Sequence, residues 1–140
     1  MKADELMIGD GVLDKAVSDK PVQIEQINEK NVHYKHGNGY MSAGVELLEP
    51  VPLTSELLEE KGFERVPQPR CINPYHWKLE KFDEEGYMLL YIKAYNTPFR
   101  GMYVSIDNYA DCETINFGKQ IEHVHELQHA FRLCNIGIDL

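Results

Sequence analysis

The stretch that most strongly indicates the fold is Pro21-Val22-Gln23-Ile24-Glu25-Gln26-Ile27, in which apolar and polar side chains alternate over most of the length. Alternation with a period of two is typical of a strand that buries one of its faces. A shorter alternation follows at Val32-His33-Tyr34-Lys35, and Gly37-Asn38-Gly39 supplies a tight reversal before Tyr40-Met41. The segment therefore predicts short antiparallel strands joined by tight turns.

The same rhythm extends to both sides of this stretch. Glu5-Leu6-Met7-Ile8 precedes the turn signal Gly9-Asp10-Gly11, and Gly44-Val45-Glu46-Leu47-Leu48 has the composition of one further strand. Several short strands with Gly-rich turns are better satisfied by a small barrel than by a flat sheet, because closure removes exposed edges. We therefore expect an SH3-like small β-barrel over residues 1–53.

The chain changes character after Pro50-Val51-Pro52-Leu53, where the prolines favour extended backbone. Thr54 is a good N-cap residue, so we expect a helix over Ser55–Lys61. This helix and a strand after it make up a linker of residues 54–66. Residues 67–74 contain three prolines, which predict a loop.

The remaining residues, 67–140, have the composition of a sheet followed by a helix. Aromatic and β-branched side chains favour antiparallel strands at residues 75–82, 87–95, 102–106 and 113–117. A helix over Lys119–Cys134 is predicted by apolar residues with a helical period at Ile121, Val124, Leu127, Phe131 and Cys134. We therefore predict an α+β protein, mostly β, in which an antiparallel sheet packed by a C-terminal helix either stands apart from the barrel or shares its core.

The charge of the chain disfavours nucleic-acid partners. Its 140 residues include 14 Lys and Arg against 23 Asp and Glu, which gives a formal net charge of −9. Phosphate backbones repel such a chain, because nucleic-acid affinity rests largely on Lys and Arg. The negative charge therefore favours a protein partner over a nucleic acid. The acidic excess is spread over both halves of the sequence, so it does not indicate any particular site.

The sequence gives no indication of a membrane or secreted protein. Its longest apolar run, Met88-Leu89-Leu90-Tyr91-Ile92, is far shorter than a membrane span, and its first residues lack the basic and apolar regions of a signal peptide. The cysteines Cys71, Cys112 and Cys134 are too few and too widely spaced for a disulfide framework. We expect a cytoplasmic protein with reduced thiols.

The strongest chemical motif is His125-Glu126-Leu127-Gln128-His129, which matches the zincin pattern H-E-x-x-H. Two histidines four residues apart share one face of a helix and can both bind Zn²⁺, while the glutamate acts as general base on a metal-bound water. The motif thus offers one alternative function: a zinc-dependent hydrolase with His125 and His129 as ligands and Glu126 as the base.

Two observations disfavour that alternative. Asn135 stands six positions after His129, where a metzincin has its third histidine, and on a helical wheel both motif histidines lie roughly opposite the apolar stripe. A catalytic zinc takes a third protein ligand, for which the sequence offers Asp139, His76 and His33. We therefore expect His125 and His129 on a solvated polar face, and assign no metal, no cofactor and no catalytic residue.

The aromatic side chains on the predicted strands have two interpretations. They are Tyr34, Tyr40, Tyr75, Trp77, Tyr87, Tyr91 and Tyr95. Such residues can line a ligand groove, but at alternating strand positions they are more often core, and we interpret them as core.

Three segments resemble a family of small proteins of uncharacterised function from Bacteroides-type gut bacteria, their phages and mobile elements. They are Lys2–Asp10, Leu48–Thr54 and Val124–Leu133, and the resemblance covers nearly the whole chain. It implies no activity. Some members carry Gln and Asn in place of Glu126 and His129, which implies that the helix is kept for packing.

We therefore expect a non-enzymatic protein-binding or interaction module of phage or mobile-element origin, since small barrels usually act by presenting loops and a groove. The zinc-dependent hydrolase is one alternative. Single-stranded nucleic-acid binding through the aromatic side chains of the barrel is the other.

Overall fold

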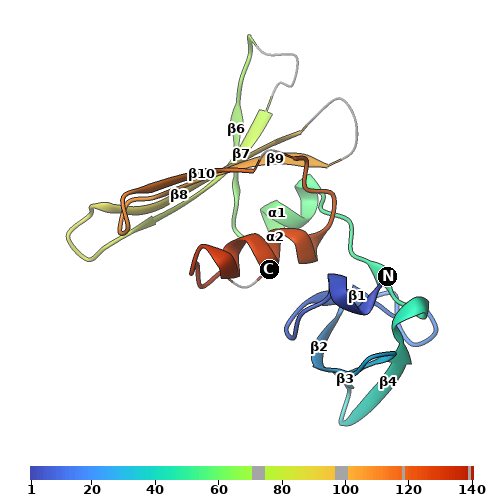
Figure 1. The fold of residues 1–140 in the computed structure, drawn as a ribbon. Coiled ribbons are helices and arrows are strands. Elements are labelled where there is room, and N and C mark those ends of the chain that lie inside the picture. The colour runs from blue at the N-terminus through green and yellow to red at the C-terminus, as the bar shows by residue number, and fades with distance from the viewer. Residues whose placement is uncertain (71–74, 97–100, 118, 139) are drawn as a thin grey trace. The chain divides into compact units, whose positions relative to one another are not determined.

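The chain is an α+β protein, mostly β, as predicted, with two antiparallel sheets and a short C-terminal helix (Figure 1). This architecture comes from a computed structural model that describes residues 1–70, 75–96, 101–117, 119–138 and 140. By its internal contacts the chain divides into two units. Unit 1 contains Met1–Pro52 and His123–Leu140, and unit 2 contains Leu53–Glu122.

This division differs from the predicted one in the place of the C-terminal helix. The boundary after Pro52 lies next to the predicted end of the first domain at residue 53. The helix, however, which the sequence groups with residues 67–140, clusters with the N-terminal strands. Residues 54–66 belong to unit 2 with the strands that follow them. Unit 1 is therefore built from the two end segments of the sequence.

Unit 1 holds a five-stranded sheet with the strand order β4-β3-β2-β1-β5. Its elements are the 3-10 helices η1 (Ala3–Glu5) and η2 (Val45–Leu47), the strands β1 (Gly11–Leu13), β2 (Val22–Ile27), β3 (Asn31–His36), β4 (Gly39–Gly44) and β5 (Glu49–Pro50), and the helix α2 (Val124–Leu133). Strand β1 is the one that α2 contacts most.

The predicted SH3-like barrel is not confirmed, because the sheet of unit 1 is open. Within the part of the chain that the structure describes, β4 and β5 stand at the two edges of the sheet and do not pair with each other. The inward side chains of the strands still form a core, which includes Leu6, Val12, Ile24, Val32 and Tyr34. The Tyr34 hydroxyl donates to Asp14 Oδ2 at 2.6 Å, so both polar groups are satisfied where they are buried. Burial and this hydrogen bond raise the pKa of Tyr34 to about 12.

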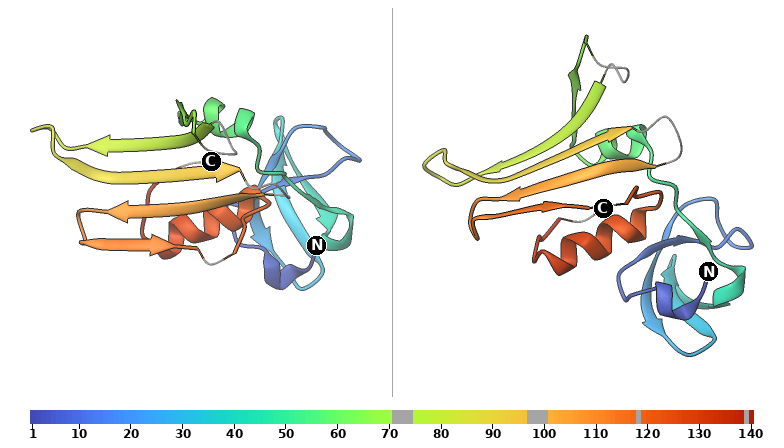
Figure 2. Two further views of the ribbon diagram at one scale, coloured as in Figure 1. Left: turned by 90° about the horizontal axis from the view of Figure 1, so that it is seen from above. Right: turned by 45° about the horizontal axis from the view of Figure 1, so that its top comes forward.

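Unit 2 holds the second sheet, with the strand order β10-β9-β8-β7-β6 (Figure 2). Its elements are the helix α1 (Ser55–Glu60) and the strands β6 (Glu64–Pro67), β7 (Tyr75–Phe82), β8 (Met88–Asn96), β9 (Met102–Asn108) and β10 (Glu113–Asn116). Strand β7 has the predicted bounds, and the other three predicted strands are found within two residues of theirs. The predicted loop at 67–74 lies partly outside the described residues.

Helix α1 begins where the sequence indicates. The Thr54 hydroxyl accepts a hydrogen bond from the Leu57 backbone at 3.2 Å, which satisfies one of the unpaired donors of the first turn. Leu58 is fully buried, and Glu59 accepts a hydrogen bond from the Trp77 indole at 2.9 Å. These contacts hold α1 to β7 within unit 2.

Helix α2 is shorter than predicted, because the residues before it pair with strands. The sequence predicts a helix from Lys119, but Ile121 forms a two-way backbone bridge with Met102, and His123 is still extended at φ −129° and ψ 153°. The helix therefore starts at Val124. The apolar side chain of Ile121 serves a β-bridge although it fits the helical period of the residues that follow.

A substitution at Gly101, which precedes β9, tests the bridge between Ile121 and Met102. Its φ is +84°, and a Cβ there would lie 2.5 Å from the Ile121 carbonyl oxygen. Gly101→Ala should therefore lower the free energy of unfolding through both backbone strain and this clash, by more than about 1 kcal/mol in urea denaturation. Gly86→Ala is the matched control, since Gly86 has φ +88° with nothing within 4 Å of a Cβ. Equal losses in the two variants would show that the clash contributes nothing.

Candidate functional site

The glutamate of the HELQH motif serves the start of α2. Glu126 Oε2 accepts a hydrogen bond from the His123 backbone N–H at 3.1 Å, and the two residues form a capping box. A carboxylate in this position satisfies a backbone donor and lies at the positive end of the helix dipole. The residue that a zincin uses as its general base is therefore part of the helix cap here.

The second histidine of the motif binds a buried carboxylate. Asp10 is fully buried, in the turn before β1, and its Oδ2 lies 2.7 Å from His129 Nε2. The other oxygen, Oδ1, accepts a hydrogen bond from Arg132 Nη1 at 2.7 Å, and the Met7 backbone N–H donates to Oδ2 at 2.7 Å. A buried charge is tolerated when it is paired and hydrogen-bonded, and Asp10 meets both conditions.

Two further contacts hold α2 against the same turn. Gln128 Oε1 accepts a hydrogen bond from the Gly11 backbone N–H at 3.1 Å. Gly9 has φ +90°, and a Cβ there would lie 2.9 Å from Arg132 Nη2. Glycine thus permits both the left-handed turn and the close approach of the guanidinium. Residues 9–11 and the helix residues 128, 129 and 132 form one polar cluster, which we name the Asp10 cluster.

The first histidine of the motif is buried beside this cluster. Only 8% of His125 is exposed, and its Nδ1 has no hydrogen-bond partner within the described part of the chain. Its ring stacks on His123 at 5.6 Å between centroids and meets the edge of His129 at 5.8 Å. Burial lowers the pKa of His125, an effect that Asp10 and Glu126 partly oppose.

The prediction that both motif histidines lie on a solvated face is wrong. His125 is buried, and His129, with 24% of its side chain exposed, lies on Asp10. The prediction from the helical wheel failed because it considered only the apolar side chains of the helix. One residue of the predicted apolar stripe, Ile121, also lies outside the helix. The polar side of α2 is in fact covered by the Asp10 turn of its own unit.

The geometry does not assemble a zinc centre from the residues that the structure describes. No group of three or more His, Cys, Asp or Glu side chains is placed there to hold a metal ion. His129 Nε2 is engaged by Asp10, and His33 Nε2 lies 3.1 Å from Asn28 Nδ2. Two residues weighed in the sequence, Asp139 and Cys71, lie outside the described residues.

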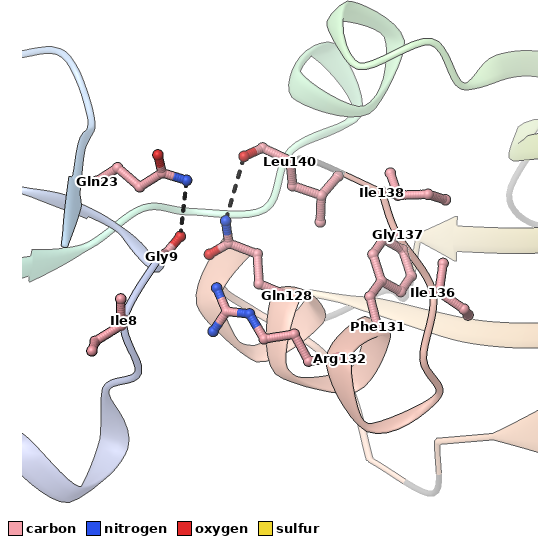
Figure 3. A pocket seen from close by; sticks show the side chains of 10 residues that line it. All are labelled: Ile8, Gly9, Gln23, Gln128, Phe131, Arg132, Ile136, Gly137, Ile138 and Leu140. Carbon is pink, nitrogen blue, oxygen red and sulfur yellow. Dashed lines mark hydrogen bonds between the residues drawn. The ribbon is translucent and has the colours of Figure 1, made fainter. Parts of the chain in front are cut away.

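A pocket of about 310 Å³ lies in unit 1 beside Arg132 (Figure 3). Its lining combines the Arg132 guanidinium and the amides of Gln23 and Gln128 with apolar side chains, of which Phe131 and Ile136 belong to the C-terminal segment. The two amides are already bonded, Gln23 to the Gly9 carbonyl at 3.2 Å and Gln128 to the Leu140 carbonyl at 3.4 Å. The lining residues thus include no nucleophilic side chain, and both amides are already used within unit 1.

The second candidate site is one face of the sheet of unit 2. Cross-strand partners point to the same side, and the register pairs Tyr95 with Tyr103 and Lys93 with both Lys78 and Ser105. The opposite side carries the buried residues Trp77, Leu90, Ile92, Ala94, Val104 and Ile106. We name the first side the tyrosine face; it consists of His76, Lys78, Glu80, Leu89, Tyr91, Lys93, Tyr95, Tyr103, Ser105 and Asp107.

The tyrosine face combines exposed apolar side chains with balanced charge. Tyr95 is 36% and Tyr103 is 41% exposed, and their ring centroids are 6.1 Å apart. The Lys93 ammonium lies 5.5 Å from the centroid of the Tyr95 ring. Lys78 donates to Glu80 at 3.2 Å, so part of the basic charge is neutralised within the face. Burial and the neighbouring Lys93 and Lys78 lower the pKa of His76.

The interpretation of the strand aromatics as core is correct for only some of them. Tyr34 and Trp77 are buried. The exposed ones are Tyr40, Tyr75, Tyr87 and Tyr95, and Tyr103, which the sequence reasoning did not consider, is exposed with them. The alternation along β8 contained the signal. Tyr91 and Tyr95 point to the same side of the strand as the charged Lys93, whereas the apolar Leu90, Ile92 and Ala94 point to the other side.

Replacing Asp10 tests the energetic role of the Asp10 cluster. Asp10→Asn removes the charge that His129 and Arg132 bind, and hydrogen bonds to charged groups contribute about 1.5–3 kcal/mol. We expect the free energy of unfolding, measured by urea denaturation at pH 7, to fall by that amount. The exposed Asp19→Asn is the control and should change it by less than about 0.5 kcal/mol. Equal effects of the two substitutions would contradict the role given to Asp10.

The buried ring of His125 predicts a loss of stability in acid. Because its pKa is lowered from the ordinary value of 6.5, the unfolded chain takes up a proton where the folded chain does not. The His125 contribution is therefore complete above about pH 6.5 and is lost as the pH falls below it. His125→Phe should flatten the dependence of the unfolding free energy on pH below about 6.5. His76, whose pKa is also lowered, contributes equally in the wild type and in the variant. An unchanged dependence of the unfolding free energy on pH in His125→Phe would therefore contradict the prediction.

None of the described helices has the length and apolar composition that crossing a bilayer requires. Comparison with known proteins adds no relative: no protein-family model, no curated protein and no solved structure matches the chain.

Proposed function

We propose that the chain is a non-enzymatic protein-binding module and that the tyrosine face is its binding surface. The observation that carries this proposal is the exposed Tyr95–Tyr103 pair on an antiparallel sheet. Tyrosine is enriched at protein interfaces, because it combines a large apolar contact area with a polar tip and few rotatable bonds. A surface of this kind fits a folded protein partner.

The charge of the tyrosine face also supports a protein partner. Lys78 and Lys93 are matched by Glu80 and Asp107 on the same side of the sheet, so the face has no basic excess to attract a phosphate backbone. Salt-independent binding is the corresponding expectation. Binding of a single-stranded oligonucleotide, weakened steeply by salt, would instead favour the nucleic-acid alternative.

The HELQH motif supports a non-enzymatic module. Glu126 caps α2, and His129 is bound to Asp10, so the groups that a hydrolase needs are used in contacts within unit 1.

The resemblance to proteins of phages and mobile elements supports a phage or mobile-element origin for the gene. Location of the gene within a prophage or a conjugative element would test that part of the proposal.

Site-specific crosslinking tests the binding surface. A photo-reactive amino acid at position 105, on the tyrosine face, should crosslink one specific protein in a Bacteroides-type host, and the purified partner should bind the purified chain directly. Tyr103→Ala should weaken that affinity about tenfold, which corresponds to ~1.4 kcal/mol at a well-packed interface. Calorimetric titration measures the change.

Tyr75→Ala is the matched control. Tyr75 is 39% exposed, close to the 41% of Tyr103, but it lies two residues before the buried Trp77 on β7, so it points to the side of the sheet opposite the tyrosine face. Its substitution should change the affinity by less than about twofold. A partner whose affinity depends on Tyr75 and not on Tyr103 would overturn the assignment of the surface.

A further inference from the structure

The four edges of the two sheets differ in how they are protected against pairing with another chain. Exposed edges are ordinarily blunted by charges, prolines or shortness. Strand β5 has two residues and ends in Pro50, β6 carries Glu64, Arg65 and Pro67, and β10 has four residues beginning with Glu113. In contrast β4, Gly39-Tyr40-Met41-Ser42-Ala43-Gly44, contains neither a charged residue nor a proline.

Strand β4 is also regular and open to solvent. It pairs with β3 at six successive positions, from Asn31 with Gly44 to His36 with Gly39, with no bulge (Figure 1). Its first four residues are exposed, with Tyr40 72% and Met41 39% exposed. The outer backbone N–H and C=O groups of such an edge are the hydrogen-bonding template that an added strand requires.

The two large side chains of β4 present different surfaces to an added strand. Met41 is opposite the buried Tyr34, so it extends the core side of the sheet. Tyr40 is on the outer side, where it lines a groove of about 310 Å³ together with Glu25, Gln26 and His33. An added strand would therefore alternate an apolar side chain beside Met41 with a polar one beside Tyr40.

We propose that β4 is a docking edge at which an extended segment of a partner protein adds a further strand to the sheet of unit 1. Backbone hydrogen bonds supply the affinity, and the contact with Met41 sets the register. This surface belongs to unit 1, so the inference goes beyond the tyrosine face of unit 2 and does not depend on it.

Charge selects the chemistry of the segment. Unit 1 contains six basic and eleven acidic side chains, a net charge of −5, while β4 itself is uncharged. This net charge attracts a basic segment and repels a second copy of a chain with a net charge of −9. The occupant that we infer is an alternating apolar and polar segment with basic rather than acidic flanks.

A designed peptide tests the proposal. The probe is a fluorescent peptide in which three valines alternate with two threonines between terminal lysines. We expect it to bind the full chain in fluorescence anisotropy and to shift the amide resonances of residues 39–44. N-methylation of the peptide amides that face β4 should weaken binding about tenfold or more, because it removes the main-chain donors to the edge. Glutamates in place of the terminal lysines should weaken it as well.

Protein variants locate the binding edge. Met41→Lys places a charge on the core side of the edge and should weaken peptide binding about tenfold or more. Thr114→Lys on the β10 edge is the matched control and should leave the affinity within about twofold, as should Tyr103→Ala on the tyrosine face. Circular dichroism establishes that each variant is folded. Should Met41→Lys not fold, the N-methylated peptide still decides, since it leaves the protein unchanged.

Four results would overturn the inference. Equal affinity for the N-methylated and unmethylated peptides would show that no strand is added. Amide shifts outside residues 39–44 would place the peptide elsewhere, and no binding at millimolar peptide would show that the edge is inert. Concentration-dependent dimers that protect the β4 amides from hydrogen exchange would assign the edge to a second copy of the chain.

Discussion

The buried carboxylate of Asp10 is the constraint on which the rest of unit 1 depends. It joins the turn before β1 to a helix more than a hundred residues further along the chain, through His129 and Arg132 at 2.7 Å each. A charge without exposure to water needs such partners, and losing them leaves it uncompensated. The position of α2, and with it the pocket beside Arg132, therefore depends on one side chain near the N-terminus.

The same constraint determines what the HELQH motif does. Its glutamate caps α2, and its second histidine binds Asp10. Its first histidine is buried, and among the residues that the structure describes its Nδ1 has no hydrogen-bond partner. A zincin instead turns both histidines towards a metal and leaves the glutamate facing a bound water. The five residues thus meet the sequence pattern for zinc hydrolysis while their side chains hold a small fold together.

Much of the strand pattern could be predicted from the sequence, because alternation and turn residues are local signals. The bounds of β7 and the Thr54 cap of α1 follow from such signals. The start of α2 does not, since the bridge between Ile121 and Met102 is a tertiary contact that overrides a helical period. Closure of the first sheet is likewise a matter of long-range pairing, and the sheet is open.

The candidate surfaces were harder to predict than the fold. Apolar periodicity cannot show that a buried aspartate covers the polar side of α2, because Asp10 and His129 are 119 residues apart in the sequence. It also treats every strand tyrosine alike, although Tyr34 is buried and Tyr95 is exposed. What distinguishes them is the side of the strand to which each points, since Tyr95 points to the same side as the charged Lys93. A charge at alternate positions is thus the better indicator of an outward face.

The nitrogen resonances of the histidine side chains, recorded with and without one equivalent of Zn²⁺, test most directly whether the HELQH helix is structural. We predict that His129 carries its proton on Nε2, hydrogen-bonded to Asp10, and that the His125 and His129 resonances do not move when zinc is added. A stoichiometric zinc-induced shift of the resonances of both rings, with loss of the Nε2 proton of His129, would contradict the structural role and favour the zinc-dependent hydrolase.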